Sequence, residues 1–261
     1  PTTDCLKKWR FPFVVMLRNM EPMKNKDLKN PFVENWINLY KKIKTVSSCR
    51  KANGVIAVSK YVKETLENDI LLNKEKLKLI YHGTEVTSLV KNTNISNDLF
   101  TSGSIRPARG LEDLIYALSI VRNNYKNIKL YIAGAVSPRM NNYMDKLIKL
   151  TKSLNVYNNI YWLGHLSKEE MNLFYSKSKI FVMTSRVEAC PNIALEAMSI
   201  GNIIISTTND PMPEFFRDGA LYYNAEDYEQ LANLIIHSMA FNNEIIKKTK
   251  NKNRIQLEKY S

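Results

Sequence analysis

The stretch IFVMTSRVEACPNIALEAMSIGNIIIS, residues 180–206, decides how the chain folds. It begins and ends with mostly apolar runs, at 180–184 and 202–206, that have the length of buried strands. A mostly apolar helix begins between them near Pro191, since proline suits a first helical turn, where its missing N–H costs no hydrogen bond. Gly201 is typical of the residue that follows a helix. This order predicts two parallel strands joined by a helical crossover.

The same alternation continues on both sides of this stretch. Strands are predicted at Leu99–Ser102, Lys129–Ala133, Asn159–Leu163, Ile180–Thr184, Asn202–Ser206 and Ala220–Tyr223. Helices are predicted to begin near Gly110, Pro138, Ser167, Pro191, Pro211 and Glu226. Because apolar strands alternate with helices, we expect an α/β fold with a parallel sheet covered on both faces.

Residues 1–83 predict a smaller unit of the same kind. Apolar runs at 11–17, 54–59 and 77–81 predict buried strands. Between the first two, apolar residues recur at helical spacing and predict a long amphipathic helix that ends near residue 52: Phe32, Trp36, Leu39, Ile43 and Val46. The Asn- and Ser-rich segment that follows predicts a linker at 84–98, with a second domain at 99–240 and a C-terminal helix at 241–261.

Composition limits the possible functions. With 261 residues and 44% hydrophobic content, the chain can bury a substantial core. Three cysteines without CxxC spacing support neither a disulfide framework nor a zinc site, so a reducing cytoplasm is expected. Residues 1–98 carry 18 Lys/Arg and 10 Asp/Glu, an excess of +8 within a net charge of +13. This excess fits attraction to anionic lipid or nucleic acid, and equally a solvated Lys-rich surface.

Two glutamates are the candidate functional residues of the opening stretch. Glu188 precedes the helix, beside the unpaired N–H groups that suit polyols and phosphates. Glu196 lies inside the helix among apolar residues, where a carboxylate needs a partner or a polar cleft. The alternative is one acid that stabilises the helix dipole and one solvated glutamate.

The segment SGSIRPARG, residues 102–110, is a second candidate because it follows a strand and opens a helix. Gly103 and Gly110 permit close approach of the backbone, while Arg106 and Arg109 bring two guanidinium groups to the same edge of the sheet. These residues predict a pyrophosphate clamp, although a glycine turn with surface arginines is a common alternative. The spacing differs from the dinucleotide-binding fingerprint.

His165 follows another strand and is a candidate to flank a base or ribose, with a local hydrogen-bonding role as the alternative. Just beyond it, Ser167 and Glu170 have the spacing of a helix capping box, so this glutamate is expected to be structural.

Five segments in order resemble one known family: SGSIRPARGLEDLIYAL (102–118), YIAGA (131–135), WLGH (162–165), EACPNIALEAMSIG (188–201) and STTNDPMPEFFRDGALYYN (206–224). They resemble the C-terminal half of retaining glycosyltransferases of the GT-B fold, the family 4 kind. The resemblance extends over about residues 54–240 through GVIAVSKYVKE (54–64) and LIYHGTEV (79–86).

The resemblance implies a role for each site residue. Glu188 would contact hydroxyls of the donor sugar, Glu196 the ribose, and Arg109 would take the place of the family's phosphate-binding lysine. Ser104 stands where the family has an arginine, so Arg106 is the candidate substitute. Backbone amides expected to face the donor belong to Ala189, Cys190 and Asn192.

The resemblance also implies two Rossmann-like domains, of which the N-terminal one, residues 1–83, is incomplete. The helix at 241–261 is expected to be cut short, so the chain is interpreted as a fragment. In the family a histidine often follows the strand that corresponds to Phe13–Leu17. Here Arg18 and Asn19 occupy this place, and whether either acts at the reacting centre stays open.

The implied activity is transfer of a sugar from a UDP- or GDP-linked donor to a glycan or lipid-linked acceptor, with retention of configuration. No metal, other cofactor or nucleic-acid partner is expected. The expected location is the cytoplasm, with peripheral contact at the inner membrane face and a role in cell-envelope polysaccharide synthesis. Alternatives are other sugar-nucleotide chemistry on the same fold, an inactive fragment, or a basic nucleic-acid-binding protein.

Overall fold

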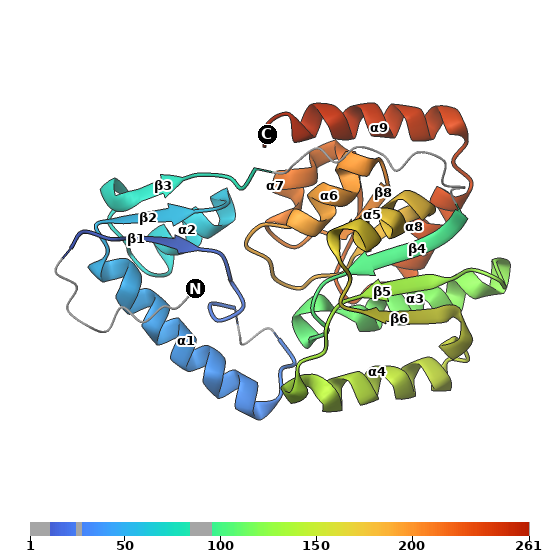
Figure 1. Cartoon of the computed structure of the whole chain (residues 1–261), viewed down its shortest axis with the longest axis horizontal. Helices are drawn as coiled ribbons and strands as arrows, with labels where there is room; N and C mark the ends of the chain where they lie inside the picture. The colour runs from blue at the N-terminus through green and yellow to red at the C-terminus, as the bar shows by residue number, and fades with distance from the viewer. Residues whose placement is uncertain (1–10, 25–27, 84–95, 261) are drawn as a thin grey trace.

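Two parallel β-sheets organise the chain (Figure 1). The computed structural model describes residues 11–24, 28–83 and 96–260. Most of the expected linker, residues 84–95, lies outside these ranges, while residues 96–98 already belong to the first strand of the second sheet. Within the described part of the chain, no helix combines the length and apolar character needed to cross a membrane.

The first sheet has three strands in the order β1-β2-β3. Its strands are β1 (Val14–Leu17), β2 (Gly54–Ala57) and β3 (Leu77–Leu79), which pair in parallel. Its helices are α1 (Phe32–Lys51) and α2 (Lys60–Asn68). The three predicted strands are confirmed but shorter than their apolar runs, and the predicted end of the long helix near residue 52 is confirmed as well.

The second sheet has six parallel strands in the order β6-β5-β4-β7-β8-β9. They are β4 (Ser96–Ser102), β5 (Leu130–Ala133), β6 (Ile160–Gly164), β7 (Ser178–Met183), β8 (Ile203–Thr207) and β9 (Ala220–Tyr223). The helices are α3 (Leu111–Asn124), α4 (Asn141–Ser153), α5 (Lys168–Lys177), α6 (Asn192–Ile200), α7 (Met212–Phe216), α8 (Tyr228–Met239) and α9 (Asn243–Leu257). All six predicted strands are confirmed.

Strand β4 begins three residues before the apolar run that predicts it. Ser96 pairs with Ser178 of β7, and the register shifts before Leu99, where regular pairing resumes. The polar residues of this irregular beginning carry no apolar pattern, so the sequence does not indicate them as strand.

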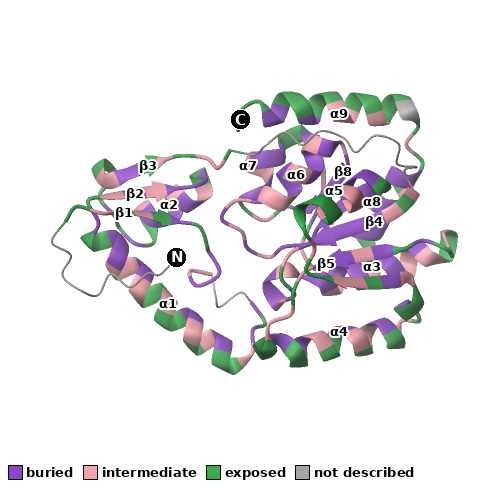
Figure 2. Cartoon of the chain, in the orientation of Figure 1, coloured by how far each residue is buried: buried purple, intermediate pink, exposed green. Residues whose placement is uncertain are grey.

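Helices cover both faces of the second sheet (Figure 2). Successive side chains of a strand point to opposite faces, so Leu99 and Phe100 belong to different hydrophobic clusters. The cluster around Leu99 contains side chains of α3, α4 and α8, and the cluster around Phe100 contains those of α5, α6, α7 and α9. All residues of β7 are buried, as expected for a central strand.

The apolar stripe of α1 faces solvent instead of a core. A stripe of this kind normally covers a core. Here Phe32, Trp36, Leu39 and Ile43 are exposed, while the buried residues of the helix are Glu34, Asn38, Thr45, Ser48 and Cys49. The helix prediction is thus confirmed, but most of its apolar face is uncovered in the described structure.

The carboxyl ends of the strands in the two sheets point toward each other (Figure 1). A third hydrophobic cluster crosses from one sheet to the other, because it joins Leu17 and Val58 to Ala108, Val187 and Ala189. Loops that follow β4 and β7 therefore pack against the first sheet, in the region where the candidate residues were expected.

Candidate functional site

The loop after β4 depends on two glycines. Gly103 has φ = +128°, and a Cβ atom there would lie 2.8 Å from Nε of Arg109. Gly134, in the loop after β5, has φ = +156°, and a Cβ there would lie 2.0 Å from the carbonyl oxygen of Gly103. The close approach of the two loops therefore requires glycine at 134, and glycine at 103 leaves room for the side chain of Arg109.

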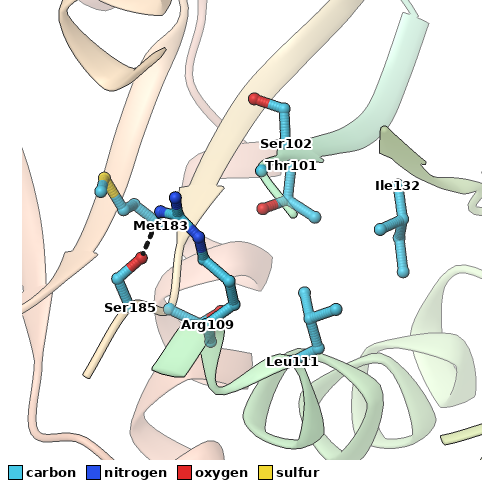
Figure 3. A pocket seen from close by; sticks show the side chains of 9 residues that line it. Thr101, Ser102, Arg109, Leu111, Ile132, Met183 and Ser185 are labelled. Carbon is cyan, nitrogen blue, oxygen red and sulfur yellow. Dashed lines mark hydrogen bonds between the residues drawn. The ribbon is translucent and has the colours of Figure 1, made fainter. Parts of the chain in front are cut away.

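Arg109 joins the loops that follow β4 and β7. It ends a 3₁₀ turn, Pro107–Arg109, and its Nη1 donates a hydrogen bond of 3.1 Å to Oγ of Ser185 (Figure 3). In return, the hydroxyl of Thr184 donates to the carbonyl oxygen of Arg109 at 2.6 Å. The side chain of Arg109 also lines a small cavity together with Gly103 (Figure 3).

Glu188 forms an ion pair with Nη1 of Arg109. The two candidates from different parts of the sequence are thus brought together at the carboxyl edge of the sheet. Their side chains are 14% and 23% exposed respectively, so neither is sealed in the core. Because a guanidinium group carries five N–H donors, Arg109 keeps donors for an anionic ligand while it is paired.

Glu196 lies on α6, and its Oε2 accepts a hydrogen bond of 3.2 Å from the hydroxyl of Tyr175. Burial raises the pKa of the Glu196 carboxyl, and the hydrogen bond from Tyr175 and the charge of Lys168 act in the opposite direction. Among the described residues, no cation lies at salt-bridge distance from Glu196, which is partly buried. A carboxylate in this situation is suited to accept hydrogen bonds from a ligand.

The loop between Glu188 and α6 is closed by local hydrogen bonds. The Sγ of Cys190 donates to Oδ1 of Asn192 at 2.8 Å, and burial raises the pKa of this thiol to about 12. The backbone N–H of Asn192, which was expected to face a donor, donates to the carbonyl oxygen of Cys190 at 3.0 Å. Ala189 is buried in the cluster that joins the two sheets.

Arg106 points away from Arg109, toward the first sheet. Its Nη1 lies 2.6 Å from Oε2 of Glu21 in the loop after β1. The expected pair of cations at one phosphate is therefore not assembled in this structure. Ser104 and His165 are both exposed in their loops.

Arg18 and Asn19 follow β1 directly. Arg18 is exposed. Burial lowers the pKa of His82, and the charge of Arg18 lowers it further. Burial raises the pKa of Cys190, and the charge of Arg18 acts in the opposite direction. Its guanidinium group is therefore close enough to influence the loop that carries Glu188. The side chain of Asn19 accepts a hydrogen bond of 2.9 Å from the N–H of Glu21 and so helps to shape the loop.

The structure also identifies contributors that the sequence did not indicate. Arg186 forms a two-pronged ion pair with Asp113 of α3, with distances of 2.7 and 2.6 Å. Asp113 also accepts hydrogen bonds from the hydroxyl of Tyr223 and the N–H of Glu226. This buried network fixes the start of the loop that carries Glu188. Asp113 is 73, 110 and 113 residues away from its three partners Arg186, Tyr223 and Glu226, so local sequence patterns carry no signal for this network.

A larger cleft of about 590 Å³ is lined in part by Arg186 and Val187. Residues of both parts of the chain line it, among them Lys24 and Tyr61 from the first and Asn209 and Asp210 from the second.

Comparisons with known proteins identify similar chains and folds. A family model described as "Glycosyl transferases group 1" matches residues 88–255. The chain is 22% identical over 180 residues to the O-antigen chain mannosyltransferase RfbU of Salmonella typhimurium, covering 69% of this chain and 49% of the relative. It is 26% identical over 165 residues to the alpha-monoglucosyldiacylglycerol synthase of Acholeplasma laidlawii, covering 61% and 40%.

Among solved structures, that of Anabaena Alr3699/HepE in complex with UDP and glucose aligns with a TM-score of 0.79 at 18% identity. The alignment covers 97% of this chain and 68% of the Anabaena chain. The present chain thus matches nearly throughout, whereas it spans about half the length, or less, of the two curated relatives.

Proposed function

The chain belongs to the glycosyl transferases group 1 family and has the GT-B fold, and we propose that it transfers a sugar from a nucleotide-diphosphate donor to an acceptor. The proposal includes retention of configuration at the sugar, which the resemblance to family 4 implies. The donor would bind in the second domain, along the loops after β4 and β7.

The ion pair between Arg109 and Glu188 is the observation that carries the proposal. It joins a cation and a hydrogen-bond acceptor next to Gly103, whose lack of a side chain leaves room for the guanidinium group of Arg109. A diphosphate needs the first of these groups, and the hydroxyls of a sugar need the second. This pairing of the two chemistries at one edge of a parallel sheet favours a nucleotide-sugar site.

The proposed chemistry follows from the charges. When a nucleotide diphosphate leaves the sugar, negative charge builds on its β-phosphate. Arg109 and the N-terminal end of α6 stabilise this charge, and removal of one such donor typically costs about 3 kcal/mol in the barrier. The proposal needs no metal ion, because these groups supply the positive charge.

The remaining site residues keep the roles that the resemblance implies. Glu188 orients the sugar hydroxyls, and Glu196 holds the ribose of the nucleotide. Gly103, Ser104 and His165 line the donor, together with the backbone amides at 189, 190 and 192. The base is uracil or guanine in this proposal, and the Anabaena relative supports the former because its complex contains UDP.

We further propose a glycan or lipid-linked acceptor in cell-envelope polysaccharide synthesis. The names of the Salmonella and Acholeplasma relatives, a mannosyltransferase of O-antigen chains and a glycolipid synthase, support this choice. The reaction would take place in the cytoplasm at the inner face of the membrane, where the +8 excess of residues 1–98 would be attracted to anionic lipid.

Arg18 is our candidate for an additional cation at the reacting centre. It follows the carboxyl end of β1, and its charge acts on Cys190, two residues beyond Glu188. In this proposal Arg18 faces the leaving diphosphate from the first domain. Because Ser104 stands where the family has an arginine, the diphosphate would otherwise contact one cation fewer than in the family pattern.

Calorimetric titration with UDP and GDP, together with a transfer assay on the longer protein, tests the proposal. We expect Glu188→Ala to abolish transfer and to leave nucleotide affinity within a few-fold, since Glu188 serves the sugar. We expect Glu196→Ala to weaken nucleotide binding itself by about tenfold, the loss of a hydrogen bond to a charged group.

Glu244→Ala is the matched control, because Glu244 is an exposed glutamate in the first turn of α9 and belongs to none of these loops. It should bind and turn over like the unaltered protein. Intact turnover in the Glu188 variant would refute the assignment of this residue, and absence of binding by both nucleotides would refute the donor class.

A further inference from the structure

One ion pair between the two domains differs from the others in burial. Arg106 and Glu21 are 2.6 Å apart, with side chains 30% and 7% exposed. Within the described ranges, Lys29 pairs with Glu226 at the surface, with side chains 84% and 61% exposed. Arg139 lies 3.5 Å from the buried carboxylate of Glu34, which is 5% exposed, but the arginine itself is 57% exposed. A pair that is exposed on both sides, such as Lys29 with Glu226, contributes little to stability.

The loop after β1 holds Glu21 in place. The backbone N–H of Glu21 donates to Oδ1 of Asn19 at 2.9 Å. Nδ2 of Asn38 on α1 lies 3.5 Å from Oε1 of the Glu21 carboxylate. A buried carboxylate that loses its cation is strongly destabilising. Glu21 therefore depends on Arg106, which comes from the other domain.

Arg106 is in turn connected to Arg109. The N–H of Arg109 donates to the carbonyl oxygen of Arg106 at 2.9 Å, which closes the turn Pro107–Arg109. Ala108, within this turn, packs in the hydrophobic cluster of the first domain that contains Leu17. Attraction between Arg106 and Glu21 thus holds the turn that carries Arg109 against the first domain.

We propose that Glu21 and Arg106 form a latch between the domains that positions Arg109 toward the diphosphate. The inference rests on the proposed function, since it concerns the same donor site. Arg106 is then a positioning residue and not a phosphate ligand. This differs from the role that the sequence suggested for it, as the second cation of the clamp.

Glu21→Gln separates the two roles of Arg106. A latch predicts that Glu21→Gln and Arg106→Gln each lower the affinity of the 261-residue chain for UDP by about tenfold. The double variant should lose no more than either single variant, because both changes break one contact. If Arg106 binds phosphate directly, Arg106→Gln loses affinity while Glu21→Gln keeps or gains it. This second pattern would overturn the proposal.

Calorimetry of UDP binding and thermal melts are measured on every variant. Arg106→Lys, which retains the charge, should recover affinity to within about threefold of the unaltered chain. Glu226→Gln, which breaks the exposed pair with Lys29, is the control and should leave affinity within about twofold. Lower melting temperatures with unchanged UDP affinity would reduce the pair to a structural contact and overturn the positioning role.

The melts also separate this inference from the proposed function. If the unaltered chain binds neither UDP nor GDP, the donor proposal fails. The latch would then still require that the two Gln substitutions be non-additive in melting temperature. Additive effects would show that the two side chains do not depend on each other.

Discussion

At the scale of single residues, burial separates the two glutamates of the site. Glu188 is compensated by Arg109 in an ion pair. Glu196 is instead half-buried on α6, with the hydroxyl of Tyr175 as its neighbour. Because desolvation disfavours the charged carboxylate, the folded protein raises the pKa of Glu196 above its ordinary value of 4.5. The charge of Glu196 therefore lowers stability in the absence of a ligand.

Glu196→Gln is expected to raise the melting temperature at pH 7. Since the pKa of Glu196 is higher in the folded than in the unfolded chain, the folded state retains its proton longer, and stability falls as the pH rises through 4.5 toward the folded pKa. Glutamine removes this loss, so the gain should be present at pH 7 and shrink below pH 4.5. Thermal melts at pH 4 and pH 7 measure it. A gain that is the same at both values would contradict the assignment to this carboxyl.

At the scale of elements, α1 shows that a confirmed helix does not settle which face is covered. Its stripe of exposed side chains includes Trp36 and Ile43, which are 60% and 61% exposed. The described strands and helices bury the polar side of the helix instead, around Asn38 and Ser48. Contiguous exposed apolar surface of this kind favours association with other apolar surfaces.

The 261-residue chain is therefore expected to self-associate as its concentration rises. Replacing Trp36 and Ile43 together by glutamine should weaken this association by about tenfold or more, because two large apolar side chains leave the exposed face. Sedimentation velocity over a range of concentrations measures the effect. Lys42→Gln, an exposed change on the same helix, should leave association unaltered. A chain that remains monomeric at high concentration would contradict the prediction.

At the scale of the whole molecule, Glu214 of α7 connects the two domains. Its carboxylate accepts hydrogen bonds from the N–H groups of Lys60 and Tyr61 at the start of α2, at 2.8 and 3.3 Å. It also accepts a hydrogen bond of 2.7 Å from the hydroxyl of Tyr81, whose pKa is raised by burial and then by this contact. A helix of one domain is thus capped by an acid from the other.

Glu214→Ala is expected to lower the free energy of unfolding by about 1–3 kcal/mol, the cost of leaving such donors unsatisfied. It should also weaken the coupling between the domains, so that calorimetry resolves two transitions. Asp218→Asn is the control. Asp218 is 75% exposed and pairs with Lys252 on the surface, so this change should have little effect. A single unshifted transition in the Glu214 variant would show that other contacts hold the domains together.

Local sequence patterns determined most of the architecture. Apolar runs indicated each strand, and proline, glycine and the capping box of Ser167 and Glu170 marked helix ends that the structure confirms. The resemblance pointed to the family, and the structural neighbours confirm the GT-B fold. These features depend on residues near one another in the chain, whose preferences act before the chain folds.

Only the tertiary structure decided which partners the charged residues take. It paired Glu188 with Arg109, but it directed Arg106 to Glu21, 85 residues away in the sequence. It also left most of the apolar stripe of α1 uncovered by the residues that the structure describes. The physical reason is that spacing along the chain specifies the face of a helix or the end of a strand, whereas an ion pair or a covered face depends on which distant element packs against it.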